Sequence, residues 1–166
     1  MMLYVVRHAI AEDAPAGGDD AARKLTPEGR RKMAGVARGL RALRVAPDVV
    51  LTSPLVRAVE TARIVVGALR DAPEPRELDG LASDVAAADT LKALRPFARS
   101  KHVMIVGHEP NLSNVIALLL TGAPDGATID MKKGGCAALE VTAFAPRGGA
   151  TLLWLLPPRV LRRVRR

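Results

Sequence analysis

The sequence predicts an α/β fold built on a mostly parallel sheet, and two observations lead to that prediction. First, short apolar runs at residues 3–6, 49–51 and 102–106 are each followed by a segment with apolar residues at helical spacing. This alternation of strand and helix is typical of parallel sheets. Second, apolar segments at 136–142 and 150–156 flank the turn Pro146-Arg147-Gly148-Gly149, which predicts an antiparallel hairpin. A length of 166 residues fits one domain.

The first helix has clear start and stop signals. Thr26 is a suitable N-cap, Pro27 follows at the first helical position, and Pro47 limits the end. Before it, the polar stretch from Asp13 to Asp20 predicts a loop. Apolar residues recur between these signals at the spacing of one helix face: Met33, Val36, Ala37, Leu40 and Leu43.

The middle of the chain continues the pattern. Thr52-Ser53-Pro54 opens a second helix, and residues 71–89 are rich in proline and acids, which predicts a surface loop with a short strand near 76–78. A third helix is expected from about Thr90 to Arg95 or beyond, before the strand at 102–106. The fourth follows Gly107-His108-Glu109-Pro110 and has apolar residues at Leu112, Val115, Ile116 and Leu119.

Composition excludes several classes of protein. The net charge is +8, but five arginines near the C-terminus account for most of it, so we expect a domain at 1–158 and a basic tail at 159–166. Only 2% of the residues are aromatic, so few side chains could stack on nucleic-acid bases. We therefore expect the tail to be solvated or to bind acidic protein surfaces, rather than to bind nucleic acid. The arginines of the tail are Arg159, Arg162, Arg163, Arg165 and Arg166.

Cys136 is the only cysteine, which excludes an intrachain disulfide and a cysteine-rich zinc site. The first apolar run has no charged region before it and is interrupted by Arg7, so it does not fit a signal peptide. The other apolar runs are far shorter than a membrane span. These observations predict a soluble, cytoplasmic protein with no membrane partner, and they leave its oligomeric state open.

Three predicted strands end in residues suited to one kind of chemistry. Arg7-His8 follows the first strand, Arg57 lies shortly after the second, and His108 follows another. Because the carboxyl ends of neighbouring parallel strands meet at one edge of a sheet, we expect the four side chains to share a pocket. Arginine forks match phosphoryl oxygens, and a neutral imidazole can attack phosphorus. The four residues suffice for phosphoryl transfer without a metal ion or other cofactor.

The same residues carry a resemblance to a known family. Arg7-His8-Ala9, Leu25-Thr26-Pro27-Glu28-Gly29, Ser53-Pro54-Leu55-Val56-Arg57-Ala58 with Thr61-Ala62, and Gly107-His108-Glu109-Pro110 together resemble the histidine phosphatase superfamily, which has the phosphoglycerate mutase-like fold. The short chain and Gly-His-Glu-Pro-Asn are similar to its SixA-type phosphohistidine phosphatase branch. The resemblance implies a three-layer α/β/α sandwich whose mostly parallel sheet carries an antiparallel edge strand. It also implies that His8 is the nucleophile, with Arg7, Arg57 and His108 as the phosphate pocket.

Three positions depart from the family pattern. Ala9 stands where glycine is usual, and Glu60, which we expect to be exposed, stands where many members have glutamine. The third departure is the general acid, because larger members carry a carboxylate in a long insertion that is short here. Glu77, Asp79 and Asp84 lie in that region, and we expect each to be a solvated loop acid, with Glu77 and Asp84 as the candidates if an acid is used.

A missing acid favours phosphohistidine as the substrate, because an imidazole can leave already protonated whereas an alkoxide needs a proton. We therefore expect a metal-independent phosphohistidine phosphatase that acts on a phosphorylated signalling or phosphocarrier protein. The alternatives are a phosphatase for a small phosphomonoester and a binding module for phosphate or an acidic partner without turnover. The mechanism requires a neutral His8, and we expect a charged His108 beside it. Lys132-Lys133-Gly134-Gly135 is expected to be a solvated turn, and the alternative is a basic rim near the pocket.

Overall fold

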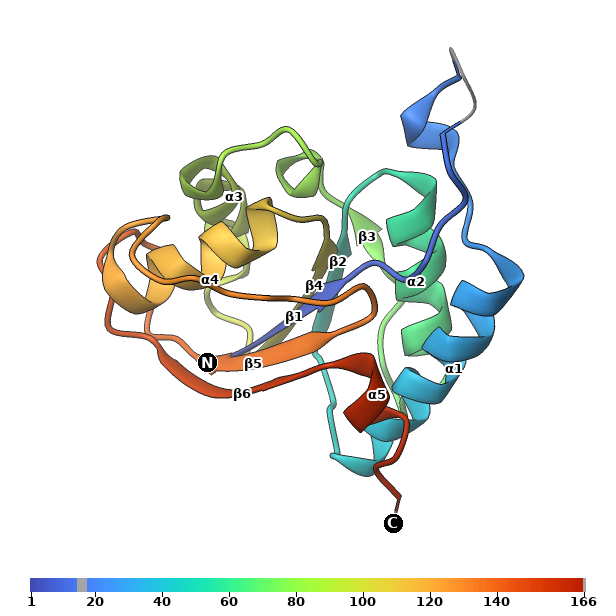
Figure 1. The fold of residues 1–166 in the computed structure, drawn as a ribbon. Helices are drawn as coiled ribbons and strands as arrows, with labels where there is room; N and C mark the ends of the chain where they lie inside the picture. The colour runs from blue at the N-terminus through green and yellow to red at the C-terminus, as the bar shows by residue number, and fades with distance from the viewer. Residues whose placement is uncertain (15–17, 166) are drawn as a thin grey trace.

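The computed structural model describes residues 1–14 and 18–165. Its centre is one six-stranded sheet (Figure 1). Its order is β3-β2-β4-β1-β5-β6. Neighbouring pairs among β3, β2, β4 and β1 are parallel, whereas β5 is antiparallel to both β1 and β6. The strands are β1 (Met2–Arg7), β2 (Val49–Thr52), β3 (Arg76–Glu77), β4 (His102–Gly107), β5 (Cys136–Glu140) and β6 (Thr151–Leu156).

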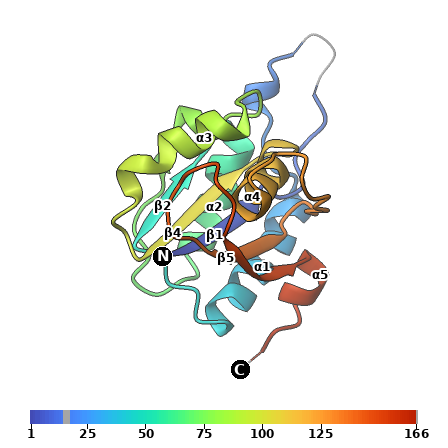
Figure 2. The same cartoon turned by 90° about the vertical axis from the view of Figure 1, so that its left-hand side faces the viewer.

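Helices cover both faces of this sheet, as Figures 1 and 2 show. α1 (Pro27–Ala42), α2 (Val56–Val66) and the short α5 (Pro158–Leu161) lie on one face, and α3 (Ala87–Leu94) and α4 (Asn111–Thr121) on the other. β1 shows why both faces are covered: Leu3 and Val5 belong to the core with α3 and α4, whereas Tyr4 and Val6 belong to the core with α1 and α2. The predicted three-layer sandwich is confirmed, and its antiparallel strand β5 lies one place inside the edge strand β6.

Local signals in the sequence explain most element ends. Thr26 caps α1, because its side chain accepts a hydrogen bond from the Gly29 N–H at 2.9 Å. α4 ends at Gly122, whose φ of 85° lies in the left-handed region that glycine adopts without strain. The predicted hairpin of β5 and β6 is confirmed. The loop between α2 and α3 contains β3 and the turn η2 (Asp79–Leu81), and η3 (Arg95–Phe97) follows α3.

The C-terminal segment is in close contact with the domain. Leu161 at the end of α5 is fully buried in the core that α1 and α2 share. The basic segment that we set apart at 159–166 therefore packs on the domain in its first part, and Arg166 lies outside the described residues. Residues 15–17 of the loop expected at Asp13 to Asp20 also lie outside them, and Asp20 begins the turn η1 (Asp20–Ala22). No helix in the described part of the chain is both long and apolar enough to cross a membrane.

Candidate active site

Three adjacent parallel strands bring the predicted residues to one edge of the sheet. β1 and β4 pair with Arg7 opposite Gly107, and β2 and β4 pair with Thr52 opposite Val106. The residues that follow the strands, His8, Ser53 and His108, therefore emerge side by side. Arg57 joins them from the first turn of α2, which begins four residues after Thr52. The structure thus brings Arg7, His8, Arg57 and His108 together, as the strand order requires.

His8 is buried, with 7% of its surface exposed, and one hydrogen bond fixes its protonation state. Its Nδ1 lies 2.7 Å from the carbonyl oxygen of Ala9. A carbonyl oxygen can only accept, so Nδ1 carries the proton and donates it. In the neutral ring Nε2 is then left with a free lone pair. The backbone N–H of His8 donates to Gly107 O at 3.0 Å, which anchors the residue to the end of β4.

Burial keeps His8 neutral. It lowers the pKa of His8 to about 3, because a buried ring is poorly solvated when charged. The hydrogen bond to Ala9 opposes this shift, whereas His108, Arg57 and Arg7 add to it by disfavouring another positive charge nearby. The ring centroids of His8 and His108 are 5.0 Å apart. At neutral pH the free protein therefore has an unprotonated Nε2 among cationic side chains.

His108 is 2% exposed and lies beside Ser53. Its Nε2 and the Ser53 hydroxyl form a hydrogen bond of 2.8 Å, while Nδ1 is buried without a partner in the described part of the chain. Burial, followed by the charge of Arg57, lowers the pKa of His108 to about 4. The expectation of a charged His108 is therefore wrong for the free protein at neutral pH, because the pocket that holds the ring is too dry and already holds cations.

Arg57 is 5% exposed and has a partner that the sequence analysis missed. Its Nη1 donates to the backbone oxygen of Asp20 at 2.7 Å, and its Nη2 donates to the Asp20 carboxylate at 2.9 Å. Hydrogen bonds from Arg23 and then Arg57 hold the pKa of Asp20 below its usual value. Asp20 also raises the pKa of His108, so its charge is felt across the site. A buried guanidinium is thus compensated by a half-exposed carboxylate.

Arg7 is held by the loop before β5. Its Nη1 donates to Met131 O at 2.7 Å, and its Nε is buried with no partner among the described residues. The N–H of Gly134 is 3.1 Å from the carbonyl oxygens of both Arg7 and His8. The turn at 132–135 therefore packs against the end of β1 through Gly134 and Gly135, whereas Lys132 and Lys133 are exposed as expected for a solvated turn. Gly134 adopts a φ of 77°, in the left-handed region that glycine adopts without strain.

The two departures near the nucleophile have structural explanations. The Ala9 N–H donates to Thr61 Oγ1 at 3.0 Å, and the alanine is 4% exposed, so its methyl group is accommodated in the core beside α2. Glu60 is not the exposed helix position that we expected. Its carboxylate accepts hydrogen bonds from the Leu25 N–H at 2.8 Å and from Arg30 Nη2 at 2.5 Å, and so joins α2 to the start of α1.

The candidate acids of the short loop lie apart from these contacts. Glu77, Asp79 and Asp84 are exposed, and none forms a hydrogen bond or ion pair with the four site residues in the described structure. The carboxyl group that lies closer is Glu109, directly after His108. Its Oε2 accepts a hydrogen bond from Ser113, its Oε1 is buried without a partner among the described residues, and burial raises its pKa. Sequence reasoning missed Glu109 as an acid because its motif explained the residue as part of a loop.

Comparison with known proteins agrees with this geometry. The model of the histidine phosphatase superfamily (branch 1) matches residues 3–83. An uncharacterized protein from Picosynechococcus sp. is 33% identical over 142 residues, which cover 84% of this chain and 85% of that protein. The chain therefore belongs to the histidine phosphatase superfamily.

Solved structures place the fold near the SixA type. The protein histidine phosphatase SixA complexed with tungstate superposes with a TM-score of 0.83 at 24% identity, over 97% of this chain and 99% of that one. A candidate SixA from Nakamurella multipartitia gives 0.75 at 26% identity, over 95% of both chains. The alpha-ribazole phosphatase from Shigella flexneri gives 0.72 at 18% identity, over 95% of this chain and 97% of that one. The fold is thus shared with enzymes named for a protein substrate and for a small one.

Proposed function

We propose that this chain is a cytoplasmic phosphohistidine phosphatase that acts on a phosphorylated signalling or phosphocarrier protein through a covalent phosphohistidine at His8. The observation that carries the proposal is the hydrogen bond from His8 Nδ1 to Ala9 O, which leaves Nε2 as the free nucleophilic atom among Arg7, Arg57 and His108. A ring oriented in this way attacks without first having to lose a proton.

The reaction has two displacements. In the first, His8 Nε2 forms a bond to phosphorus while the bond between phosphorus and the substrate nitrogen breaks. The electron pair of the broken bond returns to that nitrogen, and the substrate ring, which carries a proton on its other nitrogen, leaves as neutral imidazole. In the second, water attacks the phosphorus, the bond to Nε2 breaks, and inorganic phosphate departs with the water's oxygen. Arg7 and Arg57 stabilise the charge on the equatorial phosphoryl oxygens, which is the contribution that a metal ion makes in other phosphatases.

His108 assists once a phosphoryl group is bound. Its ring is neutral in the free protein, but a phosphoryl dianion beside it favours its protonation and so raises its pKa. The hydrogen bond to Ser53 Oγ holds the ring in place in the meantime. His108 is then a hydrogen-bond donor to the phosphoryl oxygens in the complex.

The positions of the acidic residues favour a nitrogen leaving group. Glu77 and Asp84 are exposed, and neither forms a hydrogen bond or ion pair with the four site residues within residues 1–14 and 18–165, so no such partner prepares them to donate a proton. A phosphomonoester substrate is the second candidate, and Glu109 is the observation that favours it. Its pKa is raised by burial, and it lies close enough to Arg7 for the two charges to interact.

Turnover of two substrate classes tests this proposal. The wild type and the variants Glu77→Gln, Asp84→Asn and Glu109→Gln are assayed on a phosphohistidine peptide and on sugar and nucleotide phosphates. We expect kcat/KM for phosphohistidine to be higher by on the order of 100-fold and to be retained in all three variants. If the phosphomonoesters are hydrolysed faster than phosphohistidine, and one of the three variants loses this activity, the protein is a phosphomonoesterase. Tight phosphate binding with no turnover of either class establishes a binding module.

A further inference from the structure

Leu161 and Arg162 pack against α1 at two glycines that lie one turn apart. A Cβ on Gly39 would lie 2.0 Å from the backbone oxygen of Leu161, and a Cβ on Gly35 would lie 3.0 Å from Cγ of Arg162. Only glycine allows this approach, so α5 and the residue after it rest directly on the helix backbone. The stem of Arg162 therefore packs against α1.

This packing builds a basic groove. Arg162 and Arg165 line a groove of about 530 Å³ together with Arg38 and Arg41, which lie on successive turns of α1. All four arginines are exposed, and within residues 1–14 and 18–165 none of them has a carboxylate at ion-pair distance. Like charges held together without counterions repel one another, and an anionic partner relieves that repulsion.

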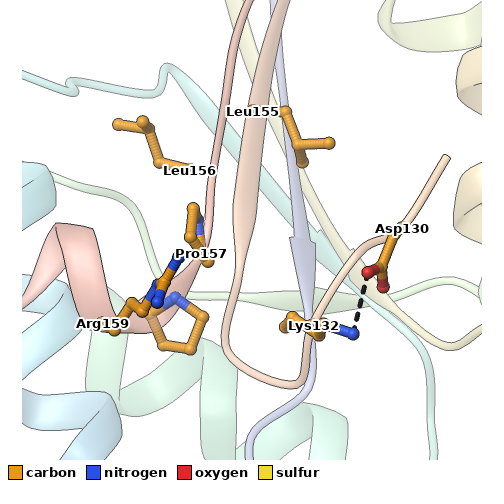
Figure 3. A pocket seen from close by; sticks show the side chains of 7 residues that line it. Asp130, Lys132, Leu155, Leu156, Pro157 and Arg159 are labelled. Atoms are coloured by element: carbon orange, nitrogen blue, oxygen red, sulfur yellow. Dashed lines mark ion pairs between the residues drawn. The ribbon is translucent and has the colours of Figure 1, made fainter.

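A second hollow lies between this groove and the segment that follows His8. It has a volume of about 110 Å³, includes Arg162 in its lining and reaches Ala9 and Ile10, the two residues directly after His8. Lys133 and Arg159 line it as well. Beyond Arg159 lies a pocket of about 490 Å³ with apolar walls, where Lys132 turns toward Asp130 and pairs with it at 2.8 Å (Figure 3).

The groove and the second hollow share Arg162, so we treat their basic residues as one basic stripe between the segment after His8 and the C-terminal half of α1. Its only ion-paired member among the described residues is Lys32, whose partner is Glu28 on the same helix. The members of the stripe are Lys32, Arg38, Arg41, Lys133, Arg159, Arg162 and Arg165.

We propose that this basic stripe binds an acidic surface of the phosphorylated protein while its phosphohistidine occupies the site at His8. The inference rests on the proposed function and names the kind of substrate. Any protein that brings a phosphorylated side chain to His8 must lie over the residues around it, and the stripe begins there. Charges arranged in this way speed encounter and select partners of opposite charge. Single-stranded nucleic acid fits less well, because the stripe has no aromatic side chain on which bases could stack.

Two synthetic phosphohistidine peptides of equal length test the inference, one with glutamates and one with lysines around the phosphohistidine. We expect the wild type to favour the glutamate peptide by about tenfold in kcat/KM, and the preference to shrink at high salt. The triple variant Arg38→Glu, Arg41→Glu, Arg165→Glu should lose the preference and keep its rate on an aryl phosphate. It leaves Arg162, whose stem packs on Gly35, unchanged.

A matched control changes the same number of charges elsewhere. The control variant changes three exposed residues around η3 and should leave the peptide preference intact. Its substitutions are Arg95→Glu, Arg99→Glu and Lys101→Glu. Equal rates on both peptides, or an equal loss in the control, overturn the inference while the proposed function stands. No turnover of either peptide removes the proposed function itself and the inference with it. A third outcome assigns the stripe to nucleic acid instead. In that case a short RNA oligonucleotide inhibits turnover of the peptides by the wild type but not by the triple variant, and the wild type shows no preference between the two peptides.

Discussion

Asp20 interacts with two of the four candidate site residues. It binds Nη1 and Nη2 of Arg57 through its backbone oxygen and its carboxylate, and it acts on His108 by charge. In the free protein this carboxylate offsets one of the two guanidinium charges that a phosphoryl dianion would meet. We therefore expect Asp20 to weaken phosphate binding at the site and to favour release of the product.

Asp20→Asn should make inorganic phosphate a stronger inhibitor, with an inhibition constant lower by roughly three- to tenfold, because one nearby negative charge is removed at a partly exposed position. The amide oxygen can still accept a hydrogen bond from Arg57. Asp19→Asn is the matched control: it removes an adjacent charge, and its side chain accepts only from Ala21 N. A higher inhibition constant in Asp20→Asn would show instead that the carboxylate serves to position Arg57.

At the scale of residues, the sequence allowed prediction of the four side chains on strand ends but not of their partners. His8, Arg57 and His108 follow apolar runs, so their position at the sheet edge could be inferred from local pattern. Asp20 lies 37 positions before Arg57 in an irregular loop, and Met131 lies 124 positions after Arg7. Contacts between a strand end and a distant loop depend on how the loop packs, so the periodicity of the sequence does not predict them.

At the scale of elements, capping and spacing predicted most helices, and the differences have local causes. α2 begins at Val56 rather than at the Thr-Ser-Pro motif, because Ser53 stays extended, with its N–H bonded to Val106 O and its hydroxyl to His108. The C-terminal helix α5 was not predicted. It has four residues, too few for a periodic pattern, and it is held by Leu161 rather than by its own helix propensity.

Gly39→Ala tests the close packing of α5 against α1. In the middle of an ordinary helix this change stabilises a protein by about 1 kcal/mol. Here the new Cβ would lie 2.0 Å from Leu161 O, so we expect α5 to shift and the free energy of unfolding to fall by about 1–3 kcal/mol. Urea unfolding measures the effect, with Arg38→Ala on the exposed side of the same helix as the control. Unchanged or higher stability of Gly39→Ala would contradict the close contact.

At the scale of the whole molecule, the sheet converts three separate sequence motifs into one site. β2, β4 and β1 are adjacent and parallel, so the residues after them converge without any long-range signal in the sequence. The same convergence buries two histidines among cations. The sequence could predict that they meet, but the dryness of the pocket, which decides their protonation, required the folded structure.

Burial of the two histidines predicts that acid destabilises the fold. Their pKa values are about 3 for His8 and about 4 for His108 in the folded state, against an ordinary value of 6.5. Below pH 6.5 the unfolded chain binds protons that the folded chain does not, so stability is lost as the pH falls from about 6.5 toward 4. Each histidine contributes a slope of up to about 1.4 kcal/mol per pH unit.

Urea unfolding at several pH values between 7 and 4 measures this slope. His8→Asn removes one of the two groups, so the dependence of its unfolding free energy on pH should be shallower than that of the wild type. An equal slope in the two proteins would show that His8 does not stay neutral through burial.

The covalent step at His8 is the central claim, and trapping the phosphoenzyme tests it most directly. The protein is mixed with a phosphohistidine peptide, quenched in alkali, where phosphohistidine is stable, and digested for mass spectrometry. We expect one phosphoryl group on the peptide that contains His8, formed at least as fast as turnover and absent from His8→Asn, whose kcat should fall by at least about a thousandfold. A phosphoryl group on another residue, or turnover by His8→Asn close to that of the wild type, would contradict the account.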